Sequence, residues 1–158
     1  MLSQMNRLSL ETEGRYATDA ELQFIIDYAQ SFPMRLQTYQ TLQELESSLV
    51  EQTHTRMKAI APQQFQFSSG DMSAKWKRDT GRVLRYTAAA VLMNDSNALR
   101  ERFLLWFQTI MRAFAAQQSC NLTYQVMQEV TLQHLTPPQV NLVNPVLEIN
   151  RRSLGMAA

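Results

Sequence analysis

A row of basic side chains in the middle of the chain has the spacing needed to hold anions. The row advances by three, four and three residues, with Asp79 at its margin, and consists of Lys75, Arg78, Arg82 and Arg85. Residues three and four apart are neighbours on a helix surface, so a helix here would place these cations along one face. Such a face can bind the carboxylates of a ligand or the acidic side chains of a partner. A solvated surface or ordinary ion pairs between subunits would give the same spacing.

The remaining chemically useful residues form no catalytic or metal-binding pattern. His54 and His134 have no second ligand at helical spacing, so there is no basis for a zinc site or a haem ligand, and we interpret both as surface histidines. The single Cys120 cannot form an internal disulfide. There is also no glycine-rich phosphate loop, no Ser/His/Asp arrangement and no carboxylate pair in an apolar setting. We therefore predict neither an enzyme nor a metalloprotein.

The composition is that of one packed helical domain. Of the 158 residues 45% are hydrophobic and 18% are charged, and only 4 Gly and 5 Pro are present to interrupt helices. The net charge of +1 gives no general attraction to nucleic acid or to an anionic membrane. The longest apolar run, residues 88–93, is far shorter than the about 20 residues that cross a bilayer. We expect a soluble protein without a transmembrane segment, in a reducing compartment.

The first part of the chain predicts long helices. Thr18 and Glu21 have the spacing of a capping box, in which a side chain and a backbone amide cap each other, so a helix should begin near Thr18. Pro33 suits the first turn of a new or kinked helix. Apolar residues then recur at helical spacing until Pro62, which indicates one long helix or two placed end to end.

A loop and a strongly patterned helix follow. Residues 62–71 have a loop composition, and Phe65 and Phe67 can pack back from it onto the core. The Asn-Asp-Ser cluster at residues 94–96 should end one helix and cap the next. That next helix carries a broad apolar stripe, which we interpret as a wall of the core: Leu99, Phe103, Trp106, Phe107, Ile110, Met111 and Phe114.

The last third predicts two more helices. We expect a short polar break at residues 117–121, followed by a helix that stops at the Pro137-Pro138 pair. A final helical stretch should be interrupted by Pro145 or begin there. No segment shows the sustained alternation of a strand. The sequence therefore predicts an all-α domain with orthogonal or globin-like packing of medium-length helices rather than a long-helix bundle.

Two segments carry more specific motifs. Residues 75–87 read KWKRDTGRVLRYT, and residues 11–22 read ETEGRYATDAEL. The first resembles the pigment-bearing helix of phycobiliproteins, in which a cysteine is followed by x-Arg-Asp and then by Leu-Arg. The second is similar to that family's acidic-x-x-x-Arg-Tyr-Leu-Ser-x-x-Glu-Leu stretch. The resemblance runs in helix order over nearly the whole chain.

The resemblance implies a single globin-like domain, residues 1–158, with an N-terminal helical extension. Residues 1–32 would be the helices through which family members dimerise, and residues 33–158 the globin-like body. The partner would be a phycobiliprotein-like subunit or a second copy of the chain. Arg85 matches the family arginine that pairs across the dimer with an acidic residue, here Glu11. The interface residues that the resemblance implies are Glu11, Arg15, Tyr16 and Arg85.

The resemblance also implies the remnant of a pigment pocket. In the family, the aspartate corresponding to Asp79 hydrogen-bonds the pyrrole nitrogens of an open-chain tetrapyrrole (a bilin), and basic side chains of the same helix meet its propionates. Arg78 and Asp79 match, but Trp76 stands in place of the cysteine whose thiol bonds the pigment. Arg82 and Val83 replace an aromatic pair. A covalent bilin is therefore excluded at the usual site, whereas non-covalent binding of a tetrapyrrole is not. The remnant consists of Trp76, Arg78, Asp79 and Arg82.

These implications lead to two main hypotheses. The first is a pigment-free phycobiliprotein-like protein of a cyanobacterium or plastid, acting through protein contacts in phycobilisome assembly, regulation or turnover. It would lie in the cytoplasm, with the phycobilisome at the cytoplasmic face of the thylakoid membrane. The second is a carrier or sensor that holds a bilin or haem without a covalent bond. An enzyme that processes tetrapyrroles would have only Asp79 as acid or base. Cys120 is either an alternative pigment attachment point or, more commonly for a lone thiol, a buried side chain.

Overall fold

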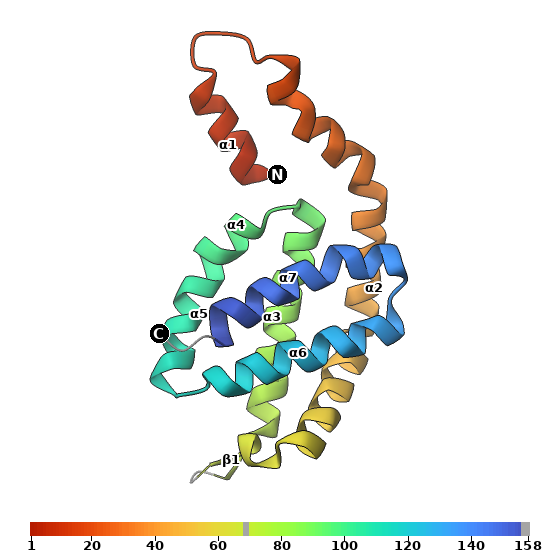
Figure 1. Ribbon diagram of the computed structural model, residues 1–158, viewed down its shortest axis with the longest axis vertical. Helices are drawn as coiled ribbons and strands as arrows, with labels where there is room; N and C mark the ends of the chain where they lie inside the picture. Colours follow the sequence, from red (N-terminus) through yellow and green to blue (C-terminus); the bar gives the residue numbers. More distant parts are fainter. Residues whose placement is uncertain (68–69, 156–158) are drawn as a thin grey trace.

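Helices make up nearly all of the chain, as the low glycine and proline content predicts (Figure 1). The computed structural model describes residues 1–67 and 70–155. The main helices are α1 (Leu2–Glu11), α2 (Asp19–Ile60), α3 (Ser73–Met93), α4 (Ser96–Leu99), α5 (Leu105–Ala113), α6 (Gln117–His134) and α7 (Pro137–Gly155). Shorter elements are the 3₁₀ turn η1 (Pro62–Phe65), the strands β1 (Gln66–Phe67) and β2 (Gly70–Asp71), and the π-helical turn η2 (Arg100–Leu104). The all-α prediction is confirmed. None of the described helices is long and apolar enough to cross a membrane.

Helix α2 begins as predicted. The Thr18 hydroxyl accepts a hydrogen bond from the backbone N–H of Glu21, and the Glu21 carboxylate accepts one from the backbone N–H of Thr18, so the capping box is present. The helix then runs for 42 residues without a break. Pro33 lies in its interior rather than in the first turn of a new helix, so the option of two helices end to end was wrong.

Two contacts with the end of α3 hold α2 on either side of Pro33. The Tyr28 hydroxyl donates a hydrogen bond to the carbonyl of Leu92 at 3.1 Å. Arg35 Nη1 donates one to the carbonyl of Val91 at 2.8 Å. A proline removes one hydrogen bond from the helix interior. These long-range bonds help to offset that loss and keep α2 continuous.

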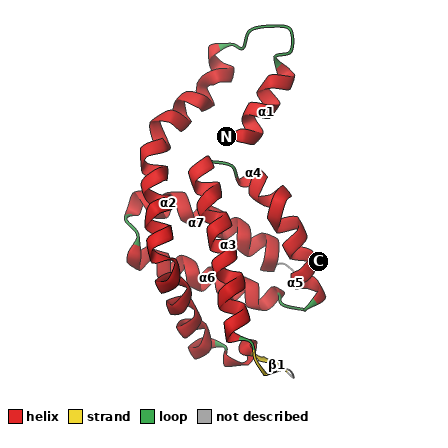
Figure 2. Ribbon diagram, turned by 180° about the vertical axis from the view of Figure 1, so that it is seen from behind, coloured by secondary structure: helices red, strands yellow, loops and turns green. Residues whose placement is uncertain are grey.

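Helix α1 and the first turns of α2 form a hairpin that projects from the other helices (Figures 1 and 2). No residue of α1 is buried. The division expected after residue 32 falls inside α2, whose later turns pack in the body of the molecule. We refer to residues 2–32 as the N-terminal hairpin.

The core lies among α2, α3, α6 and α7, and α6 runs beside α7 (Figure 1). Each of these helices contributes fully buried side chains, including Leu49, Met57, Leu84, Met127 and Leu147. The Asn150 side-chain amide of α7 donates a buried hydrogen bond to the Thr87 hydroxyl of α3 at 2.7 Å. Sliding α7 along α3 would break this bond and leave buried polar groups unpaired, which is costly. The bond therefore fixes the register of the two helices.

The loop between α2 and α3 packs back on the core, as predicted. Phe65, at the end of η1, is only 1% exposed. The two short strands after it form an antiparallel pair, with Gln66 opposite Asp71. The side chain of Phe67, for which the same was expected, is not among those that the structure describes.

The broad apolar stripe of α4 to α5 is only partly a core wall. Phe103 and Phe107 are buried, but the side chains of Trp106 and Phe114 are 52% and 63% exposed. The prediction that all seven residues lie inside was wrong for these two. The apolar stripe is wider than the part of the helix surface that packs against the body. The π-helical turn η2 also changes the number of residues per turn within the stripe, so its residues do not all point to one side.

Two predicted breaks lie elsewhere. The turn before α6 is at residues 114–116, where Ala115 has a positive φ of 50°, and α6 begins at Gln117 rather than after a polar break at 117–121. The last helix, α7, begins at Pro137 and passes through Pro145. Pro137 ends α6 as predicted, but it also starts α7, because a proline in the first turn of a helix sacrifices no hydrogen bond. The expectation of an interruption or a start at Pro145 was wrong.

The residue 94–96 cluster acts as predicted, and one of its side chains also anchors α1. Asn94 ends α3 in a left-handed conformation, and Asp95 caps α4 by accepting a hydrogen bond from the backbone N–H of Ala98. The Asp95 carboxylate accepts two further bonds, from the backbone N–H of Ser3 at 2.7 Å and from its hydroxyl at 2.8 Å. Burial alone would raise the pKa of Asp95, but the bonds from Ser3 and Ala98 hold it below its ordinary value.

Replacing Asp95→Ala should destabilise the protein and release α1. The loss of the helix cap costs about 1–2 kcal/mol in the free energy of unfolding, measurable by urea denaturation. Amide hydrogen exchange in α1 should rise at the same time, while Asp27→Ala, a change at an exposed carboxylate of α2, should leave it unchanged. The pKa of Asp95 is lowered in the folded state. The stability that its carboxylate contributes is therefore present at neutral pH and is lost as the pH falls through that lowered pKa. Unchanged exchange in α1 of the Asp95→Ala protein would contradict the proposed anchor.

Candidate functional site

A cavity of about 410 Å³ lies between α3, α5 and α6. Aromatic and apolar side chains form most of its wall, among them Phe107 and Ile110 of α5 and Tyr124 of α6. A few polar groups converge on it, including Asp79 and Arg82 of α3. A largely apolar cavity of this size with a few polar groups is typical of ligand-binding and docking sites.

Trp76 forms one wall of the cavity and is held from several sides. Its indole N–H donates a hydrogen bond to the Thr123 hydroxyl of α6 at 3.1 Å. The ring meets Phe65 edge-on at a centroid distance of 5.6 Å and lies 5.5 Å from the ring of His54. The indole is therefore a fixed, half-buried part of the packing at the cavity.

Two cations and one carboxylate of α3 line the cavity. Asp79 and Arg82 line the cavity, as does Lys75. The Lys75 ammonium is 4.9 Å from the centre of the Phe114 ring, and the Arg82 guanidinium is 5.8 Å from that of Trp106. Arg78 lies nearer the solvent, with its Nε 3.7 Å from an Asp79 carboxylate oxygen. Cations over aromatic faces are attracted by the electrons of the ring.

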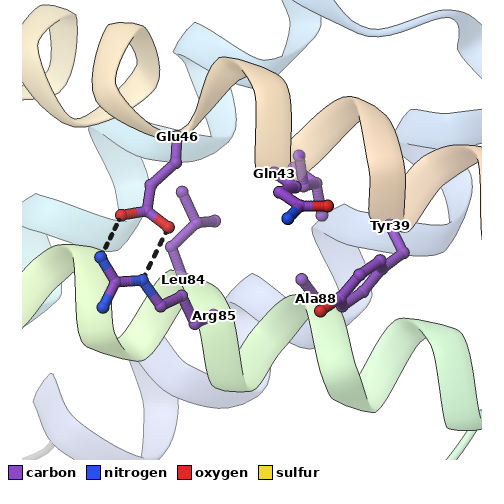
Figure 3. Close-up of a pocket in the computed structure, with 7 residues that line it drawn as sticks. Tyr39, Gln43, Glu46, Leu84, Arg85 and Ala88 are labelled. Atoms are coloured by element: carbon purple, nitrogen blue, oxygen red, sulfur yellow. Dashed lines mark hydrogen bonds and ion pairs between the residues drawn. The ribbon is translucent and has the colours of Figure 1, made fainter.

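Arg85, the last residue of the predicted basic row, lies on a different side of α3. Its guanidinium donates two hydrogen bonds, at 2.8 and 2.6 Å, to the Glu46 carboxylate of α2 (Figure 3). The pair borders a separate hollow of about 230 Å³ between α2 and α3, with Tyr39 and Leu84 beside it. The hydrogen bonds from Arg85 to Glu46 raise the pKa of the arginine. Arg85 is therefore paired within the chain, and only Lys75 and Arg82 of the row line the cavity.

The N-terminal motif residues lie near the turn of the hairpin. The Arg15 guanidinium binds the Glu21 carboxylate at 2.7 Å, and bonds from Arg15 and Thr18 lower the pKa of Glu21 to about 2. Glu11 lies 3.6 Å from Arg7, and Tyr16 is 98% exposed. Within one chain, Glu11 is therefore paired with Arg7, and Arg85 is paired with Glu46 of α2.

A family model described as phycobilisome protein matches residues 8–154. The chain belongs to the phycobilisome protein family. The resemblance carried by residues 11–22 and 75–87 is thereby confirmed, and so is the globin-like fold. Members of this family are structural light-harvesting proteins that assemble as oligomers with other subunits. A search among curated proteins found no match.

The phycobilisome family implies a bilin, and the residues at the cavity fit only part of its chemistry. An indole has no thiol, so Trp76 cannot form the thioether bond to the pigment. A carboxylate and cations do face the cavity from α3, and these are the groups that pyrrole N–H groups and propionates require. The donor set therefore fits a tetrapyrrole held without a covalent bond and not one attached at residue 76.

The only cysteine of this phycobilisome protein also lines the cavity. Cys120 is buried, and burial raises the pKa of its thiol to about 12. A thiol of such high pKa is almost wholly protonated at neutral pH and is a poor nucleophile. The interpretation as a buried thiol is confirmed, and this environment does not favour Cys120 as a pigment attachment point.

The histidines lie deeper than predicted. His54 is 6% exposed and packs against Phe65 and Trp76, so its interpretation as a surface residue was wrong. Burial, together with the nearby Lys77, lowers its pKa and favours the neutral ring. His134 is half-buried and lies 2.9 Å from the Gln52 side chain. In residues 1–67 and 70–155 no group of histidine, cysteine and acidic residues could hold a metal ion.

Sequence reasoning missed most of the cavity wall. Thr123 and Tyr124 had no recognised role, and Trp106 and Phe114 were assigned to the core. One signal was available, because an apolar stripe of seven large residues is wider than a single buried face.

Removing the indole of Trp76 should destabilise the protein more than removing that of Trp106, which also lines the cavity but is more exposed. Trp76→Ala loses the Thr123 hydrogen bond and the contacts with His54 and Phe65, and should reduce the free energy of unfolding by about 2–4 kcal/mol. Trp106→Ala, at a side chain that is 52% exposed, should cost less than about 1 kcal/mol. Urea denaturation of the two variants measures both values. Equal losses would show that Trp76 is not a structural wall.

Proposed function

We propose that this chain is a pigment-free phycobilisome protein that acts through protein contacts in assembly, regulation or turnover of the antenna. The observation that carries the proposal is the exposed apolar surface of the N-terminal hairpin. The chain would work in the cytoplasm of a cyanobacterium or in a plastid, with the phycobilisome at the thylakoid surface. No catalytic step is assigned to it.

The hairpin exposes apolar side chains on both of its helices. Leu2 is 46% and Leu10 76% exposed in α1, and Ile26 is 48% exposed in α2. Farther along α2, Phe32 and Leu36 are also exposed, at 39% and 37%. A projecting element with such residues buries little apolar area in one chain and gains from contact with a related subunit.

The electrostatic features of the hairpin support a role in partner choice. Glu13 and Tyr16 extend into solvent at its turn. The Arg15–Glu21 pair stiffens that turn within the chain. Charges at the rim of an interface mainly set partner and register, because each exposed pair contributes only about 0–1 kcal/mol.

A pull-down from a lysate that contains phycobilisomes tests this proposal. The tagged chain should recover phycobiliprotein-type subunits, and Ile26→Glu should reduce recovery at least about tenfold, because a charge replaces apolar contact. Leu132→Glu is the matched control, since Leu132 is 60% exposed but lies on α6. Recovery of no phycobiliprotein-type subunit by the unmodified chain would refute the proposal.

A second candidate function is favoured by the cavity. A bilin or haem held without a covalent bond would present its pyrrole N–H groups to the Asp79 carboxylate and its propionates to Lys75 and Arg82. Titration with biliverdin, phycocyanobilin and haem should then shift an absorption spectrum, and Asp79→Asn should weaken binding about tenfold or more. Lys77→Gln, on the opposite side of α3, should have no effect. Unchanged spectra with all three compounds would exclude this function.

A further inference from the structure

The two sides of α3 differ in how their cations are paired. On the side toward α2, the Lys77 ammonium lies 2.6 Å from the Glu51 carboxylate, and Arg85 has the bidentate partner described above. On the side toward α5, Lys75 and Arg82 contact aromatic rings. In the described part of the chain neither of these two forms a salt bridge. The cations beside the cavity therefore lack the carboxylates that their neighbours on the same helix have.

Among the described residues that line the cavity, Asp79 is the only acidic one, and it does not balance this charge. Asp79 lines the cavity, but its carboxylate is already 3.7 Å from Arg78, whose side chain is 75% exposed. Because the carboxylate of Asp79 is shared with Arg78, the positive charges of Lys75 and Arg82 beside the cavity are not fully offset. An acidic partner fits such a surface, and a neutral or basic one does not.

The apolar surface continues outward beyond the cavity. Trp106 and Phe114 form its far rim and are more than half exposed, whereas Phe103 and Phe107 of the same stripe are buried. Exposed tryptophan and phenylalanine beside arginine are typical of the energetically important residues of protein interfaces. Trp106 and Phe114 together offer more exposed aromatic surface than their buried neighbours do, which suits the apolar side chains of a protein partner.

We infer that this rim is a docking site for an acidic helical segment of a partner protein. One apolar side chain of the segment enters the cavity, and two of its carboxylates bind Lys75 and Arg82. These cations are seven residues apart on α3, a separation of about 10 Å along the helix axis. Carboxylates at positions i and i+7 of a partner helix have the same separation, with position i+3 or i+4 between them on the same face. The inference extends the proposed contact role to a second surface and does not require pairing through the hairpin.

A designed peptide tests the inference on the full chain. The peptide is a helix of about five turns with Glu at i and i+7, Phe at i+3 and no tryptophan. Trp76 and Trp106, the only two tryptophans of the chain, both line the cavity, so their fluorescence reports binding. We expect a saturable fluorescence change. The combined Lys75→Gln and Arg82→Gln variant should weaken it about tenfold, as should a peptide with Gln in place of both Glu residues.

Matched controls separate this site from the other proposals. Lys77→Gln removes a cation from the opposite side of α3 and should leave peptide binding unchanged, as should Ile26→Glu in the hairpin. The inference is overturned by the absence of a saturable change, by binding that ignores both cation substitutions, or by loss of binding in Ile26→Glu. Binding of biliverdin without binding of the peptide also overturns it and assigns the cavity to a small molecule. Apart from the result with Ile26→Glu, these outcomes leave subunit pairing through the hairpin untouched, because that pairing is tested by the pull-down.

Discussion

The packing of one indole determines how the middle of this molecule is arranged. Trp76 of α3 contacts His54 of α2, Phe65 of the following loop and Thr123 of α6, so a single side chain joins segments that are far apart in the sequence. The same ring forms a wall of the cavity. Any group that entered the cavity would therefore meet a surface fixed by the packing around it. The residue that cannot bond a pigment covalently is also the residue that stabilises the cavity as it stands.

Helix α3 gives the molecule two different surfaces because its charges are compensated on one side only. Toward α2, Lys77 and Arg85 are paired with glutamates, and these pairs link α2 and α3 at the surface of the body. Toward α5, Lys75 and Arg82 lie over aromatic rings and remain available to carboxylates. A row of basic residues in a sequence does not reveal this difference. It depends on which neighbouring helix supplies acidic side chains, and that is decided by tertiary packing.

Local signals predicted the helix types and several ends, whereas features set by distant contacts were missed. The start of α2 follows from Thr18 and Glu21, which are close in sequence and cap each other. The passage of α2 through Pro33 depends on bonds from Tyr28 and Arg35 to the end of α3, which no local pattern contains. The exposure of Trp106 was missed for a similar reason, because periodicity shows that a residue is on an apolar face but not how much of that face the body covers. The family motifs identified the site helix, but not the cavity wall that α5 and α6 contribute.

The persistence of a cavity is not by itself evidence that it binds a ligand. Phe107 and Tyr124 line it but are also buried in the core, so the packing of the body maintains them whether or not anything enters. The packing of the body does not account in the same way for the rim residues Trp106 and Phe114. Trp106 and Phe114 keep large apolar surfaces in water, and within residues 1–67 and 70–155 the cations over them form no salt bridge. Groups that add little to the stability of the isolated chain are better explained by a partner that covers them, and the exposed hairpin supports the same argument at the other end of the molecule.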